Sequence, residues 1–416
     1  MKRVLVPLFL VGLAAPSALA QPAKIGSFPR LAFNFAPPGA RSLAMGGTFI
    51  GVADDATAAG SNPAGLVILT KPEFSAHFRS TKFGEVAEET PTGFRGTGGE
   101  SSTRPSFASV VYPTKNASFS FLYNQTANFK TSNFHEDLNQ SGGFYRYNTV
   151  TYNEVKLKAN DVALAGALKV GRRLAVGISA GVRRVSLSLY GSEDYSDSDG
   201  DSYSDSVFTE DASDQKFYFN VGILANPNGK LSGGLVFKKG GEFEFDYFAG
   251  SDNRGPTFGI LGVLEAQGTA KLNIPDSFGL GLSYRPGSQW LISADAVHVK
   301  YSQLGGTNFR LSPFAQLALA DPQRFSGITV TRPDAFEDVT QLHMGAEYTF
   351  VRQTPISVRA GFYNEPDYDG DPDTESGANY VTFGGGVVLQ NRLQIDAAVS
   401  LSSIQKEGLL SAVFRF

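Results

Sequence analysis

Apolar and polar residues alternate with a period of two in several segments, and this pattern predicts β-strands. In the clearest run, Gln341 to Phe350, every second residue from Leu342 on shares an apolar face, and polar or small residues share the other. The segment 393–402 repeats the pattern. One side facing lipid and one facing a lumen would explain this alternation. A soluble β-sandwich also alternates, with its apolar face inward, so periodicity alone leaves both architectures open.

The connections between the candidate strands separate these alternatives. Tight turns are predicted near 114–116, 171–173, 227–230, 286–289, 352–355 and 390–392. Long polar segments alternate with them near 84–104, 130–148, 191–214, 250–264, 302–338 and 364–378. Short turns at one end and long loops at the other are typical of a barrel threaded through a membrane from the periplasm. With a short last hairpin at 405–408, we predict an all-β fold, a transmembrane antiparallel β-barrel of about 14 strands.

Two strands carry additional signals. The final residues Leu410, Ala412, Phe414 and Phe416 continue the outward alternation and end on an aromatic residue, which resembles the terminal signal that outer-membrane assembly machinery recognises. In another strand, Leu174 to Val182 alternate in one phase, whereas Val185, Leu187 and Leu189 are one residue out of step. This change of phase predicts a bulge or kink.

The first residues predict export. Lys2 and Arg3 precede an apolar run and the small residues Ala18 to Ala20, so residues 1–20 are predicted to be a signal peptide cut before Gln21. The alternative is a membrane anchor, but the run is shorter than the roughly 20 residues that a spanning helix needs. The chain contains no cysteine, which excludes lipid attachment near the cleavage point and disulfides. We expect the bacterial outer membrane as its location.

Residues 21–70 do not alternate as strands do. They contain Pro37, Pro38, an alanine-rich stretch and the sequence Asn62, Pro63, Ala64, in which the residue before proline favours a turn. A compact segment of small residues suits the interior of a barrel too wide for its own side chains to fill. We therefore predict an N-terminal plug, or hatch, at 21–70 and the barrel at 71–416; a loose periplasmic extension is the alternative.

Composition and chemistry favour neither nucleic acid nor catalysis. The net charge is −4, and no basic patch alternates with aromatic residues. The four histidines are scattered and there is no Gly-x-Ser-x-Gly motif, so we predict no enzyme and no cofactor, and we interpret His343 and Glu347 as polar lumen lining. Two acidic segments contain alternating aspartates that could bind calcium, but their glycine stands at the fourth place rather than the sixth, so we predict no metal site there: Asp197, Asp199, Asp201, Asp205, and Asp367, Asp369, Asp371, Asp373.

Two motifs resemble a known family. The runs Gly39 to Gly47, Ala53 to Ala58 and Asn62 to Gly65 are similar to the amino-terminal signature of the FadL-type (OmpP1/FadL/TodX) outer-membrane hydrophobic-compound transporters. The run Ile274 to Pro286, followed by Trp290 and Asp295, resembles a late hairpin of that family. The resemblance implies a fourteen-stranded barrel, a hatch carrying Asn62, Pro63 and Ala64, and a kinked strand that gives a lateral exit into the bilayer.

The resemblance also implies a function. We expect passive uptake of a hydrophobic small-molecule ligand, such as a long-chain fatty acid or an aromatic hydrocarbon, by lateral diffusion. Outer-membrane lipid and lipopolysaccharide are the expected surroundings, and Phe314, Leu317 and Leu319 could form an outer apolar patch. The run Arg41 to Leu66 is equally similar to a sister branch that includes PorV-type accessory barrels, so an accessory barrel acting with a protein partner is the alternative. A general porin would show charged lumen constrictions instead.

Overall fold

The fold was analysed on a computed structural model. It describes residues 33, 35 and 37–416, except 85, 91–92, 142–144, 198–201, 210–211, 255–261, 307–335 and 369–376. The predicted signal peptide and the candidate patch of Phe314, Leu317 and Leu319 lie outside the described residues.

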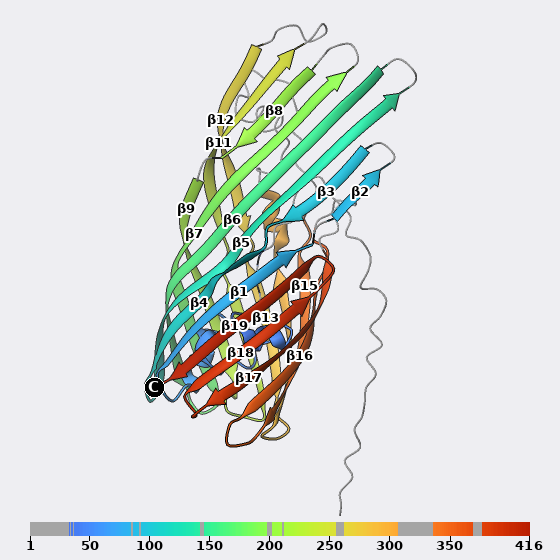
Figure 1. The fold of residues 1–416 in the computed structure, drawn as a ribbon. Helices are drawn as coiled ribbons and strands as arrows, with labels where there is room; N and C mark the ends of the chain where they lie inside the picture. The colour runs from blue at the N-terminus through green and yellow to red at the C-terminus, as the bar shows by residue number, and fades with distance from the viewer. Residues whose placement is uncertain are drawn as a thin grey trace, which may run out of the picture.

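Fourteen antiparallel strands close into a barrel (Figure 1). Around the ring they are β1 (Glu73–Phe83), β4 (Ser102–Pro113), β5 (Ala117–Ser141), β6 (Tyr145–Val170), β7 (Leu174–Asp197), β9 (Ala212–Ala225), β10 (Leu231–Lys238), β13 (Ser277–Tyr284), β14 (Trp290–Val299), β15 (Val339–Phe350), β16 (Ile356–Glu365), β17 (Ala378–Leu389), β18 (Leu393–Leu401) and β19 (Gln405–Arg415). The ring closes because β1 pairs with β19 on one side and with β4 on the other. The predicted fold class and strand number are confirmed.

The six predicted tight turns all join neighbouring barrel strands, and the predicted short last hairpin joins β18 to β19, with its turn a few residues earlier than predicted. The segment 405–408 belongs to β19, and the turn lies at 402–404, where the Ser402 amide donates to the Gln405 carbonyl at 3.0 Å. The serine hydroxyl also accepts from the Gln405 amide at 3.0 Å. Sequence placed the turn late because the polar start of β19 does not look like a strand.

Four of the six predicted long polar loops consist largely of strands among the described residues, whereas 302–338 and 364–378 lie mostly outside the described residues. β5 and β6 are 25 and 26 residues long, far beyond the roughly 9–11 that cross a bilayer. Further strands pair beside these extensions: β2 (Val86–Thr90), β3 (Gly93–Gly99), β8 (Ser202–Phe208), β11 (Gly241–Arg254) and β12 (Gly262–Ile274). The polar composition of these segments indicates contact with water, but their backbone N–H and C=O groups still form hydrogen bonds between strands. Figure 1 shows these extensions rising on one side of the barrel, above the short strands β15–β19.

Around residues 37–69 the outer face of the barrel is apolar and the inner face is largely polar. On β15, Leu342 and Met344 are 51% and 53% exposed on the outside, whereas Gln341 and His343 are buried inside, as the alternation predicts. An apolar outer face suits contact with lipid. Among the described residues, no helix is long and apolar enough to cross a membrane.

The predicted bulge in β7 is wrong. β7 pairs without a register shift with both β6 and β9. What changes is the face that carries apolar residues: Ile178 and Val182 are exposed on the outside, whereas Val185, Leu187 and Leu189 are buried inside the barrel. Above the membrane the outside meets water, so the apolar side chains pack inward.

Residues 37–69, here called the inner segment, lie inside the barrel at the end that holds the carboxy terminus (Figure 1). Their short helices are α1 (Ala40–Ala44), η2 (Ala56–Ala59) and η3 (Pro63–Ile68); a further one, η4 (Tyr301–Gly306), follows β14. Glycines of the wall approach the inner segment so closely that an added Cβ would collide with it: Gly177, Gly222, Gly234, Gly281, Gly345, Gly361 and Gly384. The wall therefore contacts the inner segment closely through these seven glycines, which we call the glycine seat.

Candidate functional site

A buried apolar cluster fills the barrel interior beyond the inner segment. It draws on the extended strands β5–β7 and on β11 and β12, with members that include Phe129, Val155, Leu157, Leu187, Phe243, Tyr247 and Leu272. We call this set the inner apolar cluster. Two aromatic residues that precede the inner segment lie against it: Phe33 is edge-on to Phe129 at 6.5 Å, and Phe35 is edge-on to Tyr301 at 5.9 Å between ring centroids.

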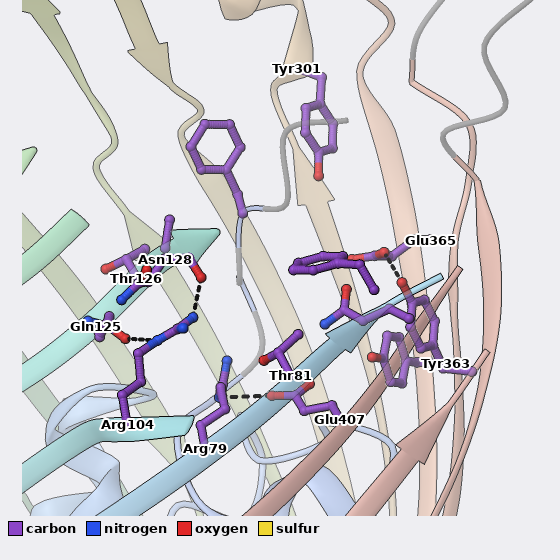
Figure 2. Close-up of a pocket in the computed structure, with 15 residues that line it drawn as sticks. Arg79, Thr81, Arg104, Gln125, Thr126, Asn128, Tyr301, Tyr363, Glu365 and Glu407 are labelled. Atoms are coloured by element: carbon purple, nitrogen blue, oxygen red, sulfur yellow. Dashed lines mark hydrogen bonds and ion pairs between the residues drawn. The ribbon is translucent and has the colours of Figure 1, made fainter. Parts of the chain in front are cut away.

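A cavity of ≈ 60 Å³ lies beside this cluster. Figure 2 shows its lining, which includes Phe33, Arg79, Phe83, Arg104, Gln125, Thr126, Asn128, Tyr301, Tyr363, Tyr380 and Glu407. We call it the wall pocket, because its lining comes from several neighbouring strands of the barrel wall. Its size leaves room for a few water molecules. A larger ligand therefore enters only if lining side chains move.

The lining of the wall pocket combines aromatic rings with charged side chains. Tyr363 and Tyr380 stack with ring centroids 4.3 Å apart, and the Tyr380 hydroxyl donates to Glu365 at 3.0 Å. In the same lining, Nε of Arg79 lies 2.8 Å from Oε1 of Glu407. The pocket could therefore hold a molecule with an apolar body and a polar group.

The hydrogen-bond ladder of the barrel wall is interrupted next to this pocket. β4 pairs with β5 only as far as Phe107 and Asn124. The ladder resumes where β3 joins β5 at Gly99 and Thr131, so the segments 102–106 of β4 and 125–129 of β5 have no ladder partner on each other. Register shifts that leave Ser106 and Thr126 unmatched in their pairings fall in the same place. We call this interruption the wall gap.

The Arg104 side chain spans the wall gap (Figure 2). Its Nε donates to Oε1 of Gln125 at 2.5 Å, and its Nη2 donates to the backbone carbonyl of Asn128. Beyond the gap, Nε2 of Gln125 donates to Asn160 on β6 at 3.0 Å. A side chain thus replaces the missing backbone bonds at this point of the wall.

A second cavity, of ≈ 40 Å³, lies between the inner segment and the wall. Phe35, Pro38 and Leu122 contribute apolar lining, and Lys238 contributes a cation. Arg183 also lines it and is paired with Asp161 at 2.6 Å. Thr126 lines both cavities, so they are neighbours.

The structure places the predicted hatch motif at the contact between inner segment and wall. Asn62 is fully buried; its Nδ2 donates to the carbonyls of Ile50 and Ile223 at 2.9 and 3.1 Å, and its Oδ1 accepts from Ala64 N. Pro63 occupies the first turn of η3, where its missing N–H costs nothing.

The lumen residues His343 and Glu347, interpreted from sequence as plain lining, bind the inner segment. Nδ1 of His343 lies 2.7 Å from the Gly46 carbonyl. Glu347 accepts from Nε and Nη2 of Arg41 at 2.9 and 3.0 Å, and from Nε of Arg359 at 2.6 Å. Sequence could not pair Arg41 with a residue about three hundred positions away.

Sequence reasoning also missed the wall gap and Arg104. A signal was present in Pro105, because a proline inside a strand is typical of an edge or a bulge. Of the acidic segments, Asp199, Asp201, Asp369, Asp371 and Asp373 lie outside the described residues.

Comparison with curated proteins finds no match. Among solved structures, the fold is similar to the toluene transporter TodX of P. putida, at 17% identity and a TM-score of 0.66 over 92% of this chain and 99% of that one. The toluene transporter TbuX of Ralstonia pickettii is similar at 17% identity and a TM-score of 0.63, over 92% and 98% of the two chains. A FadL homologue of Pseudomonas aeruginosa is similar at 13% identity and a TM-score of 0.63, over 95% of this chain and 100% of that one. These identities establish likeness of fold.

The family assignment comes from the sequence itself. The family model described as outer membrane protein transport protein (OMPP1/FadL/TodX) matches residues 34–411, which is most of the chain. The chain therefore belongs to this family, and its barrel lies in the outer membrane.

Proposed function

We propose that this protein is a passive channel for hydrophobic small molecules, such as long-chain fatty acids or aromatic hydrocarbons, and that it releases them sideways into the membrane through the wall gap. The observation that carries the proposal is the position of the wall pocket. Arg104, Gln125 and Asn128 line the pocket and also border the gap in the ladder. A molecule in this pocket is separated from the outside of the barrel by side chains alone.

The sideways route suits the outer surface at the gap. Pro105 of β4 is exposed on the outside, and its partner on β1, Phe78, is 51% exposed there. Lipid at this level offers an apolar solute a favourable environment, worth about 25 cal/mol for each Å² removed from water. Release into lipid therefore needs no energy input.

In this proposal the inner segment is a plug and Asn62, Pro63 and Ala64 are its hatch motif. Arg41 pairs with Glu347 of β15, while Asn62 bonds β9 and Ser42 to Leu43 pack near β18 and β19. Anchors on several sides of the barrel oppose passage straight through to the periplasm. A lateral exit above the segment avoids breaking them.

The named relatives support the hydrophobic cargo. Similar structures are titled as a toluene transporter and as a monoaromatic hydrocarbon channel. The family is one of transport proteins, and we propose no catalysis for this chain. On the outside, Lys156, Lys158 and Arg184 are exposed above the apolar belt, and we expect them to contact lipopolysaccharide phosphates.

The test is to close the wall gap covalently. The chain has no cysteine, so Thr103→Cys with Asn128→Cys places one thiol on each side of the gap, for a short bis-maleimide cross-linker. We expect cross-linked protein to lose uptake of labelled oleate and labelled toluene into cells. The matched control is Lys158→Cys with Ser186→Cys, because these residues already face each other across an intact ladder. Cross-linking there is expected to leave uptake unchanged.

Two results would count against the proposal. Equal uptake before and after cross-linking across the gap would exclude the lateral route. Equal uptake of both solutes by cells with and without the gene would exclude transport of these cargoes, and would favour an accessory barrel, to be pursued by capture of its protein partner.

A further inference from the structure

Arg104 is held differently from the other arginines that line the described interior. Arg41 and Arg359 bind Glu347, Arg183 binds Asp161, and Arg79 lies against Glu407. Arg104 donates only to neutral partners: the Gln125 amide oxygen, the Ser102 hydroxyl and the Asn128 carbonyl. A guanidinium without a carboxylate partner is held less firmly than one in a buried ion pair.

Two of its three contacts reach across the wall gap. Ser102 is on its own strand, whereas Gln125 and Asn128 are on the far side of the wall gap. The Asn128 carbonyl has no backbone donor on β4, and a backbone carbonyl left without a partner is costly when it is shielded from water. Arg104 therefore supplies the donor that would otherwise be missing, and it does so with a side chain that can rotate away.

An alternative position for the guanidinium exists inside the wall pocket. The carboxylate of Glu407 lines the same pocket, as do the hydroxyl-bearing side chains of Thr81 and Tyr363. Moving toward them would exchange neutral acceptors for a shared carboxylate. The gap would then be left without its bridging side chain, which is what a departing ligand requires.

From these contacts we propose that Arg104 is a latch on the lateral exit, closing the wall gap by bonding Gln125 and Asn128 and opening it when the guanidinium turns into the wall pocket. The proposal deepens the proposed function, because it assumes release through the gap. It makes Arg104 a positioning residue for transport, and it applies to neutral and anionic cargo alike.

The first variant is Arg104→Met, which keeps a long side chain and removes every donor. We expect a several-fold higher initial rate of uptake for both labelled toluene and labelled oleate, with Arg104→Lys intermediate because one ammonium cannot reach both partners as a fork does. The matched control is Arg172→Met, which removes an exposed arginine from the turn between β6 and β7. Its rate is expected to equal that of the unaltered chain.

A second variant distinguishes loss of the latch from a general folding defect of Arg104→Met. Gln125→Leu removes one partner of the latch and leaves Arg104 in place, and we expect the same direction of change. Spin labels at Thr103→Cys and Asn128→Cys provide a measurement independent of flux, and Arg104→Met is expected to shift their distance distribution to longer values and broaden it.

The outcomes separate the latch from the proposed function. If closing the gap by cross-linking stops uptake while Arg104→Met leaves both rates and the label distances unchanged, the latch is wrong and the lateral route stands. If Arg104→Met lowers oleate uptake alone, Arg104 is a contact for the carboxylate and the latch is again wrong. If cross-linking has no effect, the lateral route itself fails, and the latch fails with it.

Discussion

Nδ2 of Asn62 donates to the backbone carbonyl of Ile223 at 3.1 Å, which joins the inner segment to β9 across 161 positions of the chain. The same nitrogen bonds the Ile50 carbonyl, and the Asn62 oxygen caps η3 through Ala64. One fully buried amide thus links two parts of the inner segment to the wall.

Replacing Asn62 should loosen the inner segment. Asn62→Ala leaves two buried carbonyls without this donor, at a cost of about 2–3 kcal/mol. Asn62→Asp should cost more, although aspartate is a good helix cap, because a carboxylate oxygen would face two carbonyl oxygens. Thermal unfolding of the purified barrel, followed by the gel shift between folded and unfolded forms, measures both. A less damaging Asn62→Asp would show that capping, not donation, is the role of this residue.

The glycine seat should tolerate no side chain. A Cβ at Gly222 would lie 2.0 Å from Oδ1 of Asn62, so Gly222→Ala should displace η3 at a cost of about 1–3 kcal/mol. A cysteine at Ser61, which is buried, reports this displacement through faster maleimide labelling. Gly166→Ala on β6 is the control, because nothing lies within 4 Å of its Cβ position. Equal labelling in the two alanine variants would contradict the seat.

Glu347 should hold two arginines at once. Glu347→Gln removes the carboxylate that Arg41 and Arg359 share. Because Arg41 keeps its pair with Asp54 and Arg359 its pair with Asp396, we expect a cost of about 1.5–3 kcal/mol. Arg41→Met combined with Glu347→Gln should cost less than the sum of the two single changes. A double-mutant cycle on unfolding measures the coupling. Strict additivity would mean that the two residues act independently.

Asp276 lies at the base of the β11–β12 hairpin and should make the stability of the fold depend on pH. It lies in the connection before β13, where burial favours the neutral form, but bonds from Gly240 N, Gln303 and Lys239 outweigh this and hold the pKa of the carboxyl below its ordinary value. A lowered folded pKa gives stabilisation that is present above the unfolded pKa of about 3.9 and lost as the pH falls through the folded pKa.

The matching variant is Asp276→Asn. Its melting temperature should lie below that of the unaltered chain at pH 7, and the difference should shrink as the pH is taken below about 4. Thermal unfolding across this range measures it. A difference that stays constant with pH would show that the charge of Asp276 contributes nothing.

The sequence by itself determined the barrel. Alternation in segments such as 341–350 and 393–402, with tight turns between strands, was enough for fold class and strand number, because a wall between lipid and lumen imposes a period of two on each strand. The family was also legible, since the runs that carry the resemblance consist of consecutive residues. The sequence-based prediction failed where polar segments form paired strands instead of loops, as in the long extensions of β5 and β6.

Only the tertiary structure decided which residues meet. The phase change in β7 was visible in sequence, but a bulge and an exchange of apolar faces give the same pattern, and only the pairing with β6 and β9 distinguishes them. The wall gap depends on where β3 replaces β4 beside β5, and Arg104 bridges it through partners 21 and 24 positions away. Contacts of this kind arise from register between strands, which no local pattern of residues encodes.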